Sequence, residues 1–202
     1  MQSYDDSYAE KDFYWGRTPN SLCISVVDEI LPLLGERPSL LDLGCGEGKD
    51  LVHFARHGFD VTGVDISSPG LRKARLWAES EGLSLRTVLA DLARYRFPEA
   101  YDVVYASGSL TYIAPWMRPA AFEHFKLHTR AGGFHAVNAF VEKPFIPTPP
   151  DWGDNEHFYR SGELLAIYWD WKIVRFEETV FDCDSSGVPH RHAMDVLVAQ
   201  KP

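Results

Sequence analysis

Residues 41–48 are the part of this sequence whose residue types and spacing point most directly to chemistry, and they read LDLGCGEG. Three glycines at alternate positions follow an apolar run, so the backbone can pass close beneath a ligand without a clash at Cβ. The spacing G-x-G-x-G, followed by Lys49, departs from the G-x-G-x-x-G of a dinucleotide site and from the phosphate-binding loop G-x-x-x-x-G-K-[ST]. The stretch therefore predicts a site for another nucleotide-type cofactor.

Three carboxylates narrow the choice of cofactor. Asp42 stands two residues before the first glycine, where its charge would repel a pyrophosphate and attract a cation. Asp65, at the end of the next predicted strand, lies where ribose hydroxyls are commonly held. Asp91, at the end of the third, can accept a hydrogen bond from an exocyclic amine such as that of adenine. A cationic adenosyl ligand fits all three, so we expect S-adenosylmethionine, which carries an ammonium and a sulfonium group.

These side chains must be positioned by the elements that carry them. Apolar and β-branched runs bounded by glycine, proline and polar residues predict strands at 39–43, 60–65, 83–90, 101–106, 134–140, 171–181 and 191–200. Apolar stripes and capping residues predict helices at 21–34, 48–57, 68–81, 119–129 and 161–169. We expect Gly132 and Gly133 to close the fourth of these helices.

Strands alternate with helices up to about residue 170, which predicts βαβ crossovers and a mostly parallel sheet. The last two strands follow each other through a turn at 184–187 and predict a hairpin with one antiparallel strand. Ligands of such sheets bind at the carboxyl ends of the strands. Asp42, Asp65, Asp91 and Ser107 all fall at predicted carboxyl ends, so we expect a single site there.

With these motifs the chain resembles the class I S-adenosylmethionine-dependent methyltransferases. The resemblance rests on residues 41–48, 64–67 (VDIS), 90–92 (ADL), 101–104 (YDVV) and 131–133 (AGG). Within the class it is similar to the tellurite-resistance and thiopurine-type small-molecule methyltransferases, through residues 14–19 (YWGRTP), 158–164 (FYRSGEL) with Trp171, and 189–192 (PHRH). The resemblance implies an α/β fold with a doubly wound, seven-stranded, mostly parallel Rossmann-like sheet, and methyl transfer as the activity.

The resemblance also implies that residues 1–18 form an arm over the cofactor within a single domain, 1–202. Arg17 could pair with the methionine carboxylate, and Trp15 could face the sulfonium in a cation–π contact or simply anchor the arm. Cys45, inside the glycine turn, is expected to pack as a small residue rather than react. The full set of expected cofactor-binding residues is Arg17, Trp15, Asp42, Gly44, Cys45, Gly46, Asp65, Ile66, Asp91, Leu92 and Ser107.

Three residues are candidates for the substrate side of the site. His190 and His192 are two apart on a predicted strand and so share a face, where they could be metal ligands, a base, substrate contacts or exposed polar residues. No third ligand stands at a convincing spacing, so we expect no metal. The resemblance favours a substrate pocket for both histidines, with Tyr112 lining the methyl-transfer site or packing on a helix.

Composition restricts the partners. The net charge of −9 would repel phosphate backbones and anionic membranes, so nucleic acid and membrane are not expected partners. The N-terminus lacks an apolar leader, and three widely spaced cysteines offer no disulfide framework, which favours a cytoplasmic enzyme with a small-molecule substrate. The scarcity of bases favours a thiol, selenium or tellurium nucleophile. O- or N-methylation of a metabolite, and cofactor binding without catalysis, remain alternatives.

Overall fold

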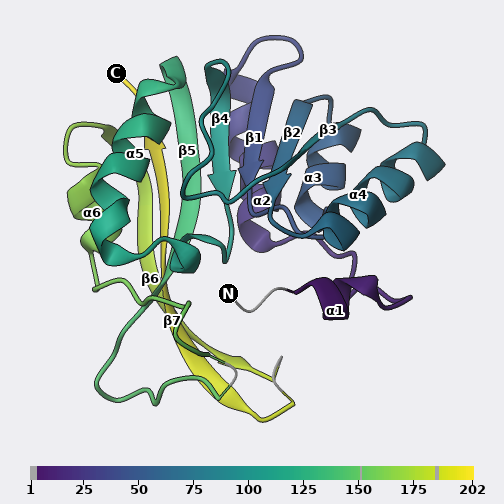
Figure 1. The fold of residues 1–202 in the computed structure, drawn as a ribbon. Helices are drawn as coiled ribbons and strands as arrows, with labels where there is room; N and C mark the ends of the chain where they lie inside the picture. Colours follow the sequence, from purple (N-terminus) through teal and green to yellow (C-terminus); the bar gives the residue numbers. More distant parts are fainter. Residues whose placement is uncertain (1–3, 151, 185–186) are drawn as a thin grey trace.

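Seven strands of the described residues form one sheet in the order β3-β2-β1-β4-β5-β7-β6 (Figure 1). The computed structural model describes residues 4–150, 152–184 and 187–202. The strands are β1 (Ser39–Leu43), β2 (Asp60–Asp65), β3 (Arg86–Leu89), β4 (Tyr101–Ala106), β5 (Thr129–Val141), β6 (Lys172–Cys183) and β7 (His190–Gln200). The pairs among β1 to β5 are parallel, whereas β7 runs antiparallel to both β5 and β6. The predicted fold class is confirmed.

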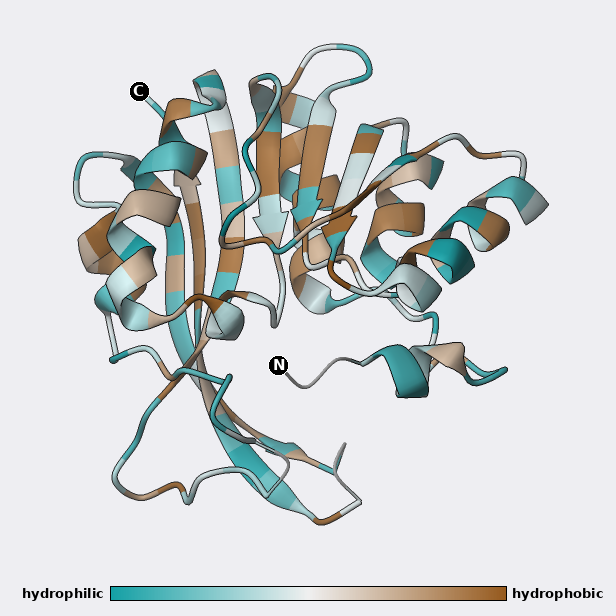
Figure 2. Cartoon of the chain, in the orientation of Figure 1, coloured by the Kyte–Doolittle hydropathy of each residue, from teal (hydrophilic) through white to brown (hydrophobic). Residues whose placement is uncertain are grey.

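Helices cover both faces of this sheet because its central strands are apolar on both sides (Figures 1 and 2). All five residues of β1 are buried; Leu40 packs with one hydrophobic cluster and Leu41 with another. The helices are α1 (Asp5–Ala9), α2 (Ser21–Ser25), α3 (Lys49–Arg56), α4 (Ser68–Ser80), α5 (Arg118–Leu127) and α6 (Glu163–Ile167). A π-helical turn (Val26–Ile30) and a 3-10 turn (Leu31–Leu33) continue α2, close to the predicted end at 34. Further 3-10 turns span Leu110–Tyr112 and Pro115–Met117.

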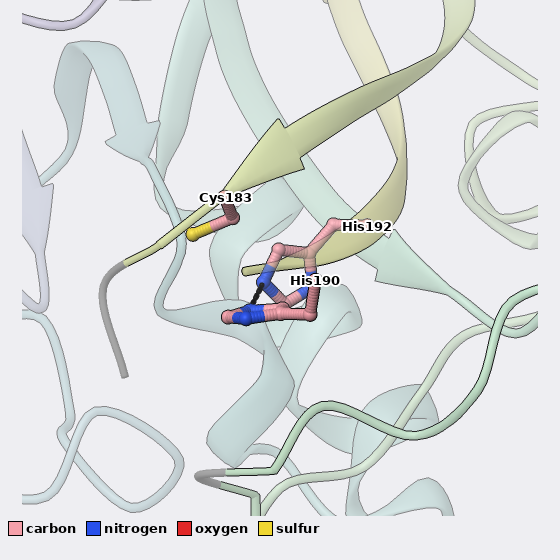
Figure 3. A group of neighbouring side chains, drawn as sticks. All are labelled: Cys183, His190 and His192. Carbon is pink, nitrogen blue, oxygen red and sulfur yellow. Dashed lines mark hydrogen bonds between the residues drawn. The ribbon is translucent and has the colours of Figure 1, made fainter. Parts of the chain in front are cut away.

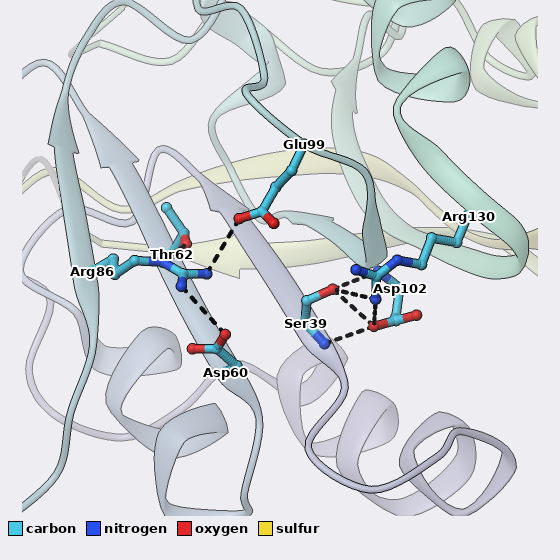
Figure 4. Close-up of polar contacts among 7 residues, drawn as sticks. All are labelled: Ser39, Asp60, Thr62, Arg86, Glu99, Asp102 and Arg130. Carbon is cyan, nitrogen blue, oxygen red and sulfur yellow. Dashed lines mark hydrogen bonds and ion pairs between the residues drawn. The ribbon is translucent and has the colours of Figure 1, made fainter.

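Charged side chains at the amino ends of the strands are paired with one another (Figure 4). The Asp102 carboxylate accepts hydrogen bonds from the backbone and hydroxyl of Ser39, both at 2.8 Å, and pairs with Arg130 at 2.6 Å. Arg86 pairs with Asp60 at 3.3 Å and with Glu99 at 3.6 Å. Burial raises the pKa of Asp102, but these hydrogen bonds outweigh it and hold that pKa below its usual value. Each of these charged side chains at the amino edge therefore has a partner of opposite charge.

The expectation that Gly132 and Gly133 close a helix is wrong. Helix α5 ends at Leu127, and both glycines lie inside β5, which begins at Thr129. A Cβ on Gly133 would lie only 2.8 Å from the backbone oxygen of Asp102, so the glycine permits close approach of β5 to β4 where their register shifts. The two glycines serve a strand irregularity rather than a helix cap.

The far end of the β6–β7 hairpin projects beyond the carboxyl edge of the sheet, beside the segment that leads from β5 to α6 (Figure 1). The register pairs Cys183 with His190 and Phe181 with His192. Residues 185 and 186 of the predicted hairpin turn lie outside the described residues. Among the described helices, none is long and apolar enough to cross a membrane.

Candidate functional site

A cavity of about 780 Å³ lies at the carboxyl edge of the sheet. Its walls come from the ends of β1 to β4, from the N-terminal arm and from the β6–β7 hairpin. Every predicted site residue except Arg17 and His190 lines it. The remaining lining includes side chains that the sequence reasoning did not single out, among them Tyr4, Tyr8, Asn20, Asp50, Asn138, Phe140, Trp152, Phe181 and Cys183.

The glycine turn is held to β2 by Asp65. The two oxygens of this carboxylate accept hydrogen bonds from the backbone of Gly46 and of Ser67, both at 2.8 Å. Gly46 has a φ of +52°, and a Cβ there would lie 3.0 Å from the Tyr8 hydroxyl of the arm. The turn therefore has no room for side chains at this point, and its backbone forms part of the cavity wall.

Asp42 and Asp65 differ from the carboxylates of the amino edge because neither forms an ion pair with a described residue. Asp42 is buried, and its burial together with the charges of Asp50 and Asp65 raises its pKa well above the usual value. Burial also raises the pKa of Asp65, against the effect of its backbone hydrogen bonds. Such a group of carboxylates favours a cationic ligand, because a bound cation relieves their mutual repulsion.

A polar network forms the floor of the cavity beneath the glycine turn. Asp50 of α3 accepts hydrogen bonds from the backbone and side-chain nitrogens of Asn20 and from the Tyr105 hydroxyl, all at 2.7 Å. The Ser107 hydroxyl accepts from Asn20 at 3.2 Å and from Asn138 at 3.0 Å. The network links α2, α3, β4 and β5, so it fixes the end of β4 at the cavity.

The N-terminal arm lies over this cavity through aromatic contacts. The Trp15 indole donates to the Tyr8 hydroxyl at 3.0 Å, and the hydroxyls of Tyr112 and Tyr4 lie 3.2 Å apart. Lys73 of α4 ties the arm to the glycine turn, since its ammonium lies 2.6 Å from the Asp12 carbonyl and 2.7 Å from the Glu47 carboxylate. Trp15 therefore both anchors the arm and lines the cavity.

Arg17 lies elsewhere than the predicted salt bridge requires. Its guanidinium stacks over the rings of Phe13, at 4.4 Å, and Trp77, at 4.9 Å, and it does not line the cavity. Among the described basic residues, Lys49 and Arg175 line the cavity instead. Lys49 follows the glycine turn directly, so of these two cations it is the better placed to pair with the carboxylate of a ligand bound at that turn.

The end of the cavity near β2 and β3 combines apolar and acidic groups. Ile66 is 40% exposed, an unusual state for an isoleucine next to a buried strand, and both Ile66 and Leu92 line the cavity. Asp91 uses one carboxylate oxygen to accept from the backbone of Ala93 at 2.9 Å. Cys45 is buried against Gly63, and burial together with Asp42 and Asp65 raises the pKa of its thiol, which suits packing rather than reaction.

Aromatic rings surround His192 at the opposite end of the cavity. Its ring lies 4.7 Å from that of Phe140, 5.5 Å from Phe181 and 6.0 Å from Trp152, measured between centroids. Nε2 of His192 lies 2.9 Å from Nε2 of His190, so the two histidines act as a pair although only His192 lines the cavity (Figure 3). The hairpin thus brings an imidazole into an apolar compartment.

Tyr112, also expected on the substrate side, lines the cavity but is a poor base. Burial and the neighbouring Tyr4 raise the pKa of its hydroxyl above the ordinary value, so it stays protonated at neutral pH. Its hydroxyl can donate a hydrogen bond or orient a ligand. Unlike Tyr112, His190 and His192 carry ring nitrogens that can accept a proton.

Comparisons with known proteins agree with this geometry. The family model of a methyltransferase domain matches residues 40–133, the segment that carries the glycine turn, Asp65 and Asp91. The probable S-adenosyl-L-methionine-dependent methyltransferase TehB of Haemophilus influenzae is 26% identical over 96% of this chain and 68% of its own length. Its crystal structure aligns with a TM-score of 0.77 at 23% identity, over 87% of this chain and 61% of that one.

A further relative is the ubiquinone biosynthesis O-methyltransferase of Photobacterium profundum, which is 30% identical over 70% of this chain and 65% of its own length. The chain thus spans about two thirds of the length of these relatives. The chain is an S-adenosylmethionine-dependent methyltransferase, as the resemblance implied, and its cofactor is S-adenosylmethionine. Among such enzymes it is similar to the TehB proteins of two Haemophilus influenzae strains, at 25–26% identity over 96% of this chain.

Proposed function

We propose that this methyltransferase acts on a small thiol or a reduced selenium or tellurium compound. The observation that carries the proposal is the compartment around His192, which is lined by aromatic rings and by sulfur-bearing side chains of Cys183 and Met194. Such a lining suits a polarisable, weakly hydrated nucleophile. A thiol loses its proton near neutral pH, so it needs little help from a base, whereas an alcohol needs strong help.

The residues of the cavity have distinct proposed roles. S-adenosylmethionine, when bound, supplies a methyl group activated by the positive sulfonium sulfur. Asp42 and Asp65 would hold its ammonium and ribose, with Lys49 rather than Arg17 near its carboxylate, and Ile66, Asp91 and Leu92 would hold the adenine. This chain's contribution is to orient the nucleophile in line with the methyl group and to exclude water.

The arm, β5 and the segment that follows β5 would supply that exclusion of water. Tyr4, Tyr8 and Trp15 lie over the cofactor end, and Phe140 and Trp152 close the substrate end. We propose that these parts act within a single domain, 1–202, on small molecules rather than nucleic acid, because the carboxylates of the cavity and the acidic net charge both disfavour a polyanion.

O-methylation of a metabolite is the second candidate. The similarity to a ubiquinone biosynthesis O-methyltransferase favours it, and the His190–His192 pair could serve as the base that a hydroxyl acceptor needs. The two candidates differ in what they need from the protein: a hydroxyl acceptor would need the His190–His192 pair as its base, whereas a thiol acceptor would not.

The test is a set of acceptors matched in shape that differ only in the reacting atom: an aryl thiol, the corresponding phenol and the corresponding aniline. Initial rates of methyl transfer are measured with isotopically labelled cofactor. The proposal predicts turnover of the thiol well above that of the other two. Preferential methylation of the phenol would replace it with the second candidate, and Asp65→Asn serves as a cofactor-site control that should slow every acceptor alike.

A further inference from the structure

Three potential metal ligands meet on one face of the β6–β7 hairpin (Figure 3). Cys183 lies on β6, directly opposite His190 on β7, and His192 is two residues further along the same strand. Residues opposite each other in an antiparallel pair, and residues two apart on a strand, point to the same face. The Cys183 sulfur and one nitrogen from each histidine all lie within 4.8 Å of one another.

From the sequence alone no metal is expected, because no third ligand stands at a convincing spacing from His190 and His192. Cys183 supplies one, and its position follows from the hairpin register rather than from any spacing visible along the chain. Two imidazole nitrogens and one thiolate form a donor set that prefers zinc and similar transition metals over calcium or magnesium.

Hydrogen bonds around His190 orient it as a metal ligand. Its Nδ1 lies 2.8 Å from the backbone oxygen of Val188. Because a carbonyl only accepts, Nδ1 carries the proton and Nε2 presents its lone pair toward His192. An imidazole whose second nitrogen donates to a backbone carbonyl is the usual arrangement of a metal-binding histidine. In the metal-free hairpin His192 then donates to His190 across 2.9 Å, and a metal would replace that shared proton.

The ligands also border the substrate end of the cavity. Cys183 and His192 both belong to the cavity lining, as do the aromatic rings of Phe140 and Phe181. Zinc is commonly bound by four ligands, and sites with three protein ligands keep the fourth position for water or substrate. A metal held by the three hairpin residues would therefore have its remaining position on the side of the cavity.

We infer that Cys183, His190 and His192 form a three-ligand binding site for Zn²⁺ whose open position faces the methyl-acceptor compartment. The presence of the site stands on the hairpin geometry alone, whereas its use rests on the proposed function. A thiol entering the site gives its proton to solvent and binds zinc as a thiolate in place of water. Its sulfur then attacks the methyl carbon, the bond from that carbon to the sulfonium sulfur breaks with its electron pair passing to that sulfur, and a thioether leaves.

The test measures metal binding rather than turnover. The reduced protein, residues 1–202, is titrated with Co²⁺, which reports a cysteine ligand through a sulfur-to-metal charge-transfer absorption, and Zn²⁺ is then added in competition. We expect one equivalent of Co²⁺ to produce the band and one of Zn²⁺ to displace it. Cys183→Ser should abolish the band, and His190→Gln should weaken binding more than about 100-fold, beyond the effect typical of losing an outer partner.

Controls separate the site from general effects. His57→Gln changes an exposed histidine directly after α3, outside the cavity lining, and should leave the titration unchanged. Calorimetric binding of S-adenosylmethionine by each variant shows that it is folded. Absence of the band in the unaltered protein, or its survival in Cys183→Ser, would overturn the inference. A normal band together with no methylation of any thiol would support the metal site and refute the proposed function.

Discussion

Two glycines that flank α3 offer a direct test of the packing that holds the cofactor turn. Gly48 precedes the helix with a φ of +89°, and Gly58 follows it with a φ of +88°. Alanine at either position costs roughly 1–2 kcal/mol for the left-handed backbone. Only at Gly48 does the added Cβ meet a neighbour, the Cβ of Ala74 on α4 at 2.6 Å, while the space around Gly58 is open to 4 Å. Ala74 has no rotamer through which to yield.

The clash adds an overpacking cost of about 1–3 kcal/mol to Gly48→Ala alone, since carbon atoms in contact normally lie about 3.5–4.0 Å apart. We therefore expect Gly48→Ala to lower the free energy of unfolding by about 1–3 kcal/mol more than Gly58→Ala, in urea denaturation followed by circular dichroism. It should also weaken binding of S-adenosylmethionine, because the displaced residue ends the glycine turn. Equal costs for the two variants, with equal affinity for the cofactor, would refute the reasoning.

Further perturbations test the charges and the arm. Asp42→Asn should stabilise the ligand-free protein against urea at neutral pH, and it should weaken cofactor binding at least about tenfold by calorimetry. Folding raises the pKa of Asp42, so the gain in stability should disappear below about pH 4, where Asp42 is protonated in both the folded and the unfolded protein. Asp102→Asn should lower the free energy of unfolding by about 1–2 kcal/mol. Because folding lowers the pKa of Asp102, this difference should be present above about pH 4 and vanish as the pH falls further. A difference that stays constant with pH would contradict this explanation. Trp15→Ala should raise the KM for the cofactor and expose the arm to limited proteolysis, and unchanged cleavage would argue against its anchoring role. His192→Ala should reduce turnover of accepted acceptors with little change in cofactor affinity, whereas unchanged turnover would remove it from the substrate pocket.

The central strands of the sheet could be predicted because their own residues and the turns beside them indicate where each strand begins and ends. The strands at 39–43, 60–65 and 101–106 match the structure residue for residue, since each is a largely buried run bounded by turns or polar residues. Parallel strands then place their carboxyl ends together, which gathers Asp42 and Asp65 at one edge.

Contacts between distant segments could not be predicted in this way. Asn138 is the polar residue within the apolar stretch 136–141 of β5, a signal that could have marked it, but its partner Ser107 is set by strand order. Asp50 lies in an ordinary helical pattern that gives no sign of a role at the cavity. Its partner Asn20 occupies a position that is equally typical of a helix cap. Arg17 packs on aromatic rings because the path of the arm, rather than the charge of the residue, decides its neighbours.

The most direct test of the account is the fate of the methyl group. The protein is incubated with S-adenosylmethionine carrying a deuterated methyl group and the matched thiol and phenol in the same reaction, and the products are identified by mass spectrometry. We expect a labelled thioether and S-adenosylhomocysteine in equal amounts, with little labelled ether. Label found mainly on oxygen, or cofactor bound and returned unchanged, would contradict it.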